Sequence, residues 1–295
     1  MSPVASVRQI GRSAVRGLGM ATAPLRDLPD FVLIGAKRCG TTSLYRVLEQ
    51  HPAMMPLFPP SDHLPMQENI KGVHYFDREA ERSDVWYRSH FATSTAKRLR
   101  SRRIGGKVVT GEASPYYMFH PTGVEQALRH LPDSSFIVML RNPIDRAYSH
   151  HKEQVRNGRE PLSFTEALEA EESRLAGEVP RILAEPSYYS YDHENRSYLA
   201  QSMYGSVLRP WFDSFPRDRF HIIRSEDFYA APTDVLRGVE GFLGLAPHDY
   251  ADLRARNAAP GSDLDPGLRR ELWDRLAPDV ALLEKQCGRS FDWGP

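Results

Sequence analysis

One stretch near the N-terminus combines a lysine, two glycines and three hydroxyl side chains in a spacing suited to binding a phosphate ester. Four apolar residues, Phe31 to Ile34, precede Gly35, and the segment after Gly40 opens with hydroxyls and then becomes periodically apolar. This order predicts a buried strand, a glycine-bounded loop and a helix N-terminus. Such a junction directs free backbone N–H groups and the positive end of the helix dipole at one point. The candidate anion-binding residues are Lys37, Arg38, Cys39, Gly40, Thr41, Thr42 and Ser43.

This loop differs from the nucleotide-binding P-loop at one position. That motif places a lysine directly after its second glycine, where the side chain reaches the β- and γ-phosphates. Here Thr41 follows Gly40, and the lysine lies inside the loop at Lys37. The loop is therefore predicted to hold a phosphate ester with its cation placed differently. A glycine-bounded turn that binds nothing is the alternative.

A second segment further along the chain supplies an arginine and a serine. Phe136 to Leu140 forms an apolar strand, Arg141 follows it, and Pro143 suits the first turn of a helix that contains Ser149. In open parallel sheets, ligands bind beyond the carboxyl ends of the strands. A guanidinium there offers two parallel N–H groups to a phosphate. The alternative is an arginine that forms a salt bridge at the strand end.

Taken together, the two segments resemble the sulfotransferase superfamily. The segment 35–43 resembles its 5′-phosphosulfate loop, and the segment 141–149 resembles its 3′-phosphate element. Further matches point to the branch that contains the heparan sulfate sulfotransferases and their bacterial relatives. These matches lie at 71–77, 111–117, 215–220 and 242–245.

The resemblance implies a donor, 3′-phosphoadenosine 5′-phosphosulfate (PAPS), and in-line transfer of its sulfuryl group to an acceptor hydroxyl or amine. Lys37 would stabilise the leaving oxygen, and the loop backbone with its hydroxyls would hold the 5′-phosphate. Arg141 and Ser149 would hold the 3′-phosphate. No metal is required, because the loop donors and a lysine can neutralise the leaving group.

The sequence leaves the identity of the general base open between two residues. Relatives carry a glutamate where this chain has Gly72, so that role does not transfer. His74, which titrates near neutral pH, and Glu112, at the end of a predicted strand, are the two candidate catalytic replacements for it. Ala113 stands where those relatives carry a lysine that reads an acidic polysaccharide, which argues against a heparan-type acceptor. The expected acceptor is a small molecule or glycan: a carbohydrate, glycolipid or secondary metabolite.

The bulk properties exclude several other classes. The 295 residues contain 38 Lys and Arg and 38 Asp and Glu, so net charge gives no general attraction to nucleic acid or membranes. Two cysteines, Cys39 and Cys287, cannot support a disulfide framework or a cysteine metal site. No apolar run approaches the length of a membrane span. A cytoplasmic location is predicted. Residues 1–29 are predicted to be a flexible basic arm that could touch an anionic membrane surface, and 30–295 a single domain.

Alternating strand and helix patterns predict an α/β fold with a P-loop-like, mainly parallel central sheet and helices on both faces. Strands are predicted at 31–35, 73–76, 107–111, 136–140 and 219–224. Helices are predicted at 42–50, 121–131, 143–157, 163–176, 196–214, 232–243 and 266–287. Irregular segments are predicted at 56–71, 97–107, 177–195 and 255–263. The basic stretch 97–107 is read as a solvated loop, and the tyrosine-rich 177–195 as the acceptor-contacting loop.

Two further function classes remain open. A P-loop small-molecule kinase explains the strand, loop and helix but lacks the motif's lysine. A non-catalytic nucleotide-binding relative would keep the donor site without a base, which Gly72 allows.

Overall fold

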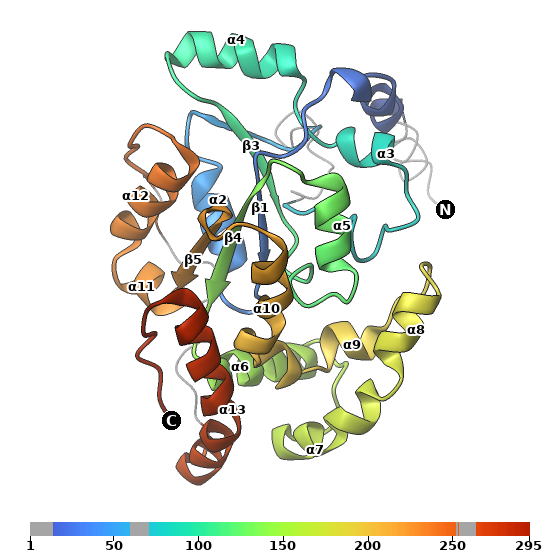
Figure 1. Ribbon diagram of the computed structural model, residues 1–295, viewed down its shortest axis with the longest axis vertical. Coiled ribbons are helices and arrows are strands. Elements are labelled where there is room, and N and C mark those ends of the chain that lie inside the picture. Colours follow the sequence, from blue (N-terminus) through green and yellow to red (C-terminus); the bar gives the residue numbers. More distant parts are fainter. Residues whose placement is uncertain (1–13, 60–70, 252, 254–263) are drawn as a thin grey trace.

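A five-stranded parallel sheet lies at the centre of the protein. The computed structural model describes residues 14–59, 71–251, 253 and 264–295. The strand order is β2-β3-β1-β4-β5 (Figure 1). The strands are β1 (Phe31–Gly35), β2 (Met54–Met55), β3 (Val109–Ala113), β4 (Ser135–Leu140) and β5 (Phe220–Arg224). Every residue of β1 and β3 is buried, as in parallel sheets that are covered on both faces. The predicted fold class is confirmed.

The path of the chain creates a crevice beside β1. The chain reaches β3 on one side of β1 and then crosses to β4 on the other side. Right-handed crossovers therefore place α2 (Thr41–Leu48) on one face, and α5 (Gly123–His130) and α10 (Tyr204–Ser214) on the opposite face. Ligands bind at such a reversal, outside the carboxyl ends of the strands. In Figure 1 the strand arrowheads point toward α6 (Pro143–Arg156) and α9 (Tyr191–Asn195), which lie at that edge.

The remaining helices surround this core. They are α3 (Asp84–Arg88), α4 (Ser94–Ile104), α7 (Phe164–Leu175), α8 (Glu178–Ala184), α11 (Ser225–Ala230), α12 (Pro232–Leu243) and α13 (Pro266–Cys287). Helix α10 packs along α13 and against α5. The indole N–H of Trp211 in α10 donates to the carbonyl oxygen of Met118 at 3.0 Å, and its ring lies 5.4 Å from that of Phe136 in β4.

The predicted strand at 73–76 is wrong. Residues 71–78 contain no strand, although the Ala113 amide donates to the Lys71 carbonyl oxygen at 2.7 Å. The next amide, that of Val73, turns to the side chain of Glu112 at 2.6 Å instead of to a backbone partner. The ladder therefore stops after one bond, and the short strand β2, which was not predicted, pairs with β3.

Three other predictions of irregular or helical structure need correction. The basic stretch 97–107 is largely helix α4, which begins at the capping residue Thr93 and ends at Gly105 in the left-handed conformation, with φ 67°. The segment 177–195 contains α8 and α9, so it is largely helical. The predicted helix 196–214 begins only at Tyr204. The predicted irregular segment 255–263 lies outside the described residues, as does most of 56–71.

Residues 14–29, part of the predicted arm, contact the domain. Residues 14–21 are helical, and the guanidinium of Arg16 donates to the side chain and carbonyl oxygen of Ser89 at 2.9 and 3.1 Å. Ala23 and Arg26 are buried. The contacts of the domain therefore reach back at least to Arg16.

Candidate active site

The loop after β1 has the geometry of an anion-binding cradle. Gly40 caps α2 in the left-handed conformation, with φ 93°, which glycine adopts without strain. A Cβ at Gly40 would lie 2.5 Å from Oη of Tyr229, so a larger residue would have to displace that side chain as well as adopt a strained backbone. Ser225, which follows β5, donates from Oγ to the Cys39 carbonyl oxygen at 2.6 Å. These contacts fix the loop so that the N-terminus of α2 opens at the carboxyl edge of the sheet.

Lys71 adds a third positive charge near Lys37 and Arg38 of the loop, and it was not among the predicted site residues. Nζ of Lys71 donates to Oγ1 of Thr42 in the first turn of α2 at 2.8 Å. Burial and then the positive charges of Arg46, Lys37 and Arg38 lower the pKa of Lys71 to about 8. Mutual repulsion of this kind is relieved when an anion binds between the cations. The sequence did contain a sign that Lys71 belongs to the site, because it is the first residue of the segment 71–77 that resembles the family.

The second predicted element lies at the same edge. The Ala36 amide donates to the Met139 carbonyl oxygen at 2.8 Å, so the loop after β1 and Arg141 after β4 leave adjacent strands. Nε and Nη2 of Arg38 each lie 3.4 Å from Oγ of Ser149 in α6, and Nη1 of Arg38 donates to Glu153 at 2.5 Å. The structure therefore brings Ser149 directly against the loop.

Cys39 is buried under this loop. Its Sγ lies 3.6 Å from Oη of Tyr204, which itself donates to the Arg141 carbonyl oxygen at 3.0 Å. Burial raises the pKa of the Cys39 thiol. This residue therefore supports the loop as a neutral, space-filling side chain, and not as a thiolate.

The ammonium of Lys37 is bound to helix α9. Its Nζ donates to Oε1 of Glu194 at 2.9 Å, to Oδ1 of Asn195 at 3.2 Å and to the Glu194 carbonyl oxygen at 3.3 Å. Burial lowers the pKa of Lys37 more than Glu194 raises it. Burial would raise the pKa of Glu194, but the charges and hydrogen bonds of Lys37 and Arg78 outweigh it and lower that pKa to about 2.

Glu194, Asn195 and Arg78 were absent from the predicted site. The two α9 residues lie within the tyrosine-rich segment 177–195, but their spacing from Lys37 in the chain gave no sign of contact.

His74 lies next to a buried carboxylate. Its Nδ1 is 3.0 Å from Oδ2 of Asp77, whose side chain is fully buried, whereas 31% of the His74 side chain is exposed. Burial would lower the pKa of His74, but the hydrogen bond and charge of Asp77 outweigh it and raise that pKa. The backbone of His74 has φ 57°, a rare conformation for a residue with a side chain, and its amide donates to Oγ of Ser114 at 3.1 Å. Such strain is typical of functional positions.

Glu112 is fully buried behind His74, with both carboxylate oxygens engaged. Oε2 accepts from the Val73 amide at 2.6 Å and from Oγ of Ser114 at 2.7 Å, and Oε1 accepts from the hydroxyls of Tyr87 and Tyr117 at 2.8 and 3.3 Å. Burial raises the pKa of Glu112. In this position it holds the 72–74 segment and is enclosed by its hydrogen-bond donors.

Gly72 passes close to the end of β3. A Cβ at this position would lie 2.4 Å from the Ala113 carbonyl oxygen and 2.6 Å from Oγ of Ser114. This backbone path excludes any side chain at position 72, so a base has to come from elsewhere in the site.

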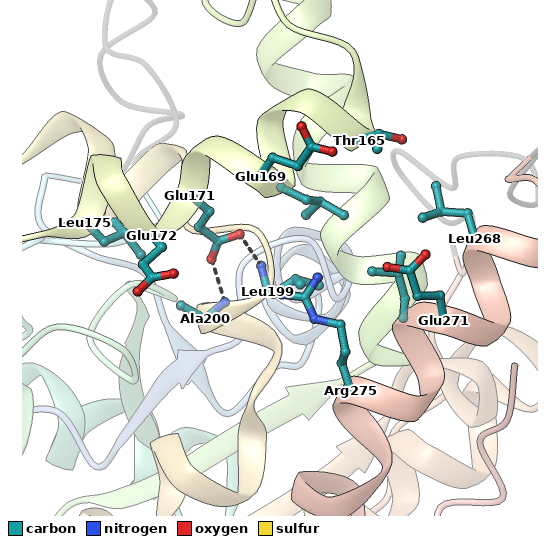
Figure 2. Close-up of a pocket in the computed structure, with 12 residues that line it drawn as sticks. Thr165, Glu169, Glu171, Glu172, Leu175, Leu199, Ala200, Leu268, Glu271 and Arg275 are labelled. Atoms are coloured by element: carbon teal, nitrogen blue, oxygen red, sulfur yellow. Dashed lines mark hydrogen bonds between the residues drawn. The ribbon is translucent and has the colours of Figure 1, made fainter.

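A cavity of about 420 Å³ lies between α7 and α13 (Figure 2). The charged side chains of its lining are mainly acidic, which does not suit a negatively charged nucleotide donor. Its lining includes Glu169, Glu171, Glu172 and Glu271, with Arg275 opposite. The carboxylate of Glu171 accepts from the backbone amides of Leu199 and Ala200, both at 2.8 Å. An anionic ligand would be repelled there.

Comparison with known proteins now assigns the chain to a family. The sequence profile described as "Sulfotransferase family" matches residues 29–249. The chain belongs to this family. A solved structure, a sulfotransferase from Alicyclobacillus acidocaldarius, is 30% identical with a TM-score of 0.62, and the match covers 90% of this chain and 98% of that one. The resemblance inferred from the motifs is thereby confirmed.

Curated relatives agree with this assignment. The membrane-associated sulfotransferase kil1 of Dictyostelium discoideum is 23% identical over 90% of this chain and 66% of its own length. The human heparan sulfate glucosamine 3-O-sulfotransferase 6 is 26% identical over 80% of this chain and 58% of its own. The chain thus spans two thirds or less of these relatives.

Within residues 14–59, 71–251, 253 and 264–295, no three His, Cys, Asp or Glu side chains are grouped so that they could hold a metal ion. No helix in those ranges is long and apolar enough to cross a membrane.

Proposed function

We propose that the protein transfers a sulfuryl group from PAPS to a hydroxyl or amine of an acceptor by in-line displacement. The observation that carries this proposal is the ammonium of Lys71, which binds Thr42 in the first turn of α2 and lies close enough to Lys37 and Arg38 for their charges to lower its pKa. Three cations and a helix N-terminus around one loop form a site for a doubly charged phosphate ester. Family membership supplies the reaction class.

The donor is proposed to lie along the carboxyl edge of the sheet. The amides of the loop, the hydroxyls of Thr41, Thr42 and Ser43, and the ammonium of Lys71 hold the 5′-phosphate. Arg141, which precedes α6, and Ser149, which lies within α6 and contacts Arg38, hold the 3′-phosphate, as the resemblance to the family implies. Lys37 stabilises the charge on the leaving oxygen as its bond to sulfur breaks.

We assign the general base to His74. A neutral imidazole with its Nδ1–H directed at Asp77 leaves Nε2 as an acceptor for the proton of the attacking hydroxyl. The oxygen of the acceptor forms the new bond to sulfur, and the electrons of the old bond remain on the 5′-phosphate. Asp77 orients the ring and stabilises the imidazolium that results. Glu112 does not contact the acceptor in this proposal: it accepts hydrogen bonds from the Val73 amide and from Ser114, and it thereby positions His74.

The acceptor is proposed to approach from the α8–α9 side, where Tyr189 and Arg78 lie near Lys37. The ring of Tyr189 lies 5.5 Å below the guanidinium of Arg78, and its Oη accepts from Nδ2 of Asn195 at 2.9 Å. Aromatic faces of this kind suit a carbohydrate, glycolipid or secondary metabolite. The heparan sulfate activity named for one relative belongs to that protein. A cytoplasmic location stays a prediction.

Calorimetric titration with 3′-phosphoadenosine 5′-phosphate (PAP), compared with ADP and AMP, tests the donor class. We expect metal-independent binding that requires the 3′-phosphate and is lost in Arg141→Ala. Equal affinity for AMP and PAP, or a strict need for Mg²⁺ with ADP, would overturn the proposal and favour a kinase. PAP binding without transfer to any acceptor in a broad panel would favour a non-catalytic relative.

A further inference from the structure

The buried carboxylate of Glu194 forms an ion pair with the ammonium of Lys37, the group proposed to bind the donor. The side chain of Glu194 is only 2% exposed, and its Oε1 lies 2.9 Å from Nζ of Lys37. A lysine ammonium has three N–H donors. Here the three acceptors are Oε1 of Glu194, Oδ1 of Asn195 and the Glu194 carbonyl oxygen. Lys37 therefore cannot bind a donor oxygen without releasing at least one contact with α9.

Glu194 is held in place independently of Lys37. Nη2 of Arg78 donates to Oε1 at 2.6 Å, and Nε of Arg78 donates to Oε2 at 3.0 Å, so the guanidinium binds the carboxylate in a bidentate manner. Its backbone is also fixed, because Nε2 of Gln201 donates to the Glu194 carbonyl oxygen at 2.8 Å. The carboxylate would therefore stay in the site when Lys37 turns away from it.

We infer that Glu194 is an internal counter-anion of Lys37 that the donor displaces, and that it thereby sets donor affinity and links the donor loop to α9. The inference rests on the proposed function, because it takes the Lys37 loop as the donor site. Two anions, the Glu194 carboxylate and the 5′-phosphate group, compete for one ammonium. Removing the charge of the internal competitor favours the external one.

The link to α9 has a consequence for the acceptor. Once Lys37 has moved, Arg78 is the one charged partner left to Oε1 of Glu194 among the residues that the structure describes, and this oxygen regains the capacity to accept a hydrogen bond. That oxygen then faces the acceptor side of Lys37, where a neutral or cationic acceptor is favoured over a polyanionic one. Binding of donor and acceptor becomes coupled through this one side chain, and such coupling is reciprocal.

Titration of purified full-length variants with PAP tests the inference. Glu194→Gln preserves the shape of the side chain and removes its charge, so PAP should bind about tenfold more tightly than to wild type. In a Lys37→Met background, the same substitution should leave PAP affinity unchanged, since the contested ammonium is gone. Glu178→Gln is the matched control, because Glu178 accepts from Oη of Tyr188 at 2.8 Å on the neighbouring helix α8.

The outcomes separate the inference from the proposed function. If wild type fails to bind PAP, the donor assignment itself is wrong. If wild type binds PAP but Glu194→Gln binds it equally or more weakly, with thermal unfolding like that of Glu178→Gln, Glu194 positions Lys37 and does not compete for it. Should Glu194→Gln not fold, Asn195→Ala removes a neutral acceptor of the same ammonium and should tighten PAP binding by a smaller factor. Weaker or unchanged binding by that variant would overturn the inference as well.

Discussion

The lysine that precedes Gly72 makes a sharp test of the donor site. Nζ of Lys71 reaches Oγ1 of Thr42 at 2.8 Å, and its pKa is lowered to about 8 by burial and by the charges of Arg46, Lys37 and Arg38. In the free protein this ammonium therefore loses its proton within an accessible pH range. Replacing Lys71 with methionine keeps most of the apolar stem and removes the titrating group.

The expected magnitude follows from that pKa. A bound phosphate group raises the pKa of a neighbouring ammonium, so donor binding favours the protonated form. With a free-state pKa of about 8, the affinity of wild type for PAP should fall about tenfold as the pH rises from roughly 7 to 9. Lys71→Met should bind PAP about tenfold more weakly than wild type at the lower pH, because one charge-assisted hydrogen bond is lost.

Calorimetry with PAP at several pH values measures both effects. The phosphates of PAP are already ionised over this range. Lys37 also has a lowered pKa, with Glu153 as a further charge nearby, so the informative quantity is the difference in slope between wild type and Lys71→Met. Equal slopes for the two proteins would refute the role of Lys71, and a flat profile in wild type would refute the pKa argument.

Three other substitutions test the segment that carries the base. Gly72→Ala should lower the unfolding free energy by about 1–3 kcal/mol, because its Cβ would lie 2.4 Å from the Ala113 carbonyl oxygen, and unchanged thermal unfolding would contradict that close approach. Asp77→Asn should move the acidic limb of the pH–rate profile to lower pH and reduce kcat, since Asp77 raises the pKa of His74. The His74–Asp77 pair also stabilises the folded wild type, and this contribution to the unfolding free energy should be lost as the pH rises through the raised pKa of His74. The variant should not show that loss. Glu112→Gln should destabilise the fold by about 1–3 kcal/mol through mismatched buried donors, so a fully stable but inactive variant would return the base role to Glu112.

The sequence determined the features that depend on neighbouring residues. The apolar runs 31–34 and 136–140, the glycine-bounded loop and the proline at the start of α6 each act through local backbone preference, and all of these elements were predicted. The match of residues 29–249 to the sulfotransferase family depends on the same ordered motifs. Local signals failed at 73–76, because the amide of Val73 donates to the side chain of Glu112 and not to the backbone of a neighbouring strand.

Only the tertiary structure decided which side chains meet. Lys37 and Glu194 are 157 positions apart, and Lys71 and Thr42 are 29 apart, so no spacing rule could join them. The strand order brings the ends of β1, β3 and β4 to one edge, and the packing of α9 against that edge places a carboxylate on the loop lysine. The environment of Glu112 was equally invisible in sequence, because burial and hydrogen-bond partners are properties of the folded core and not of the residue itself.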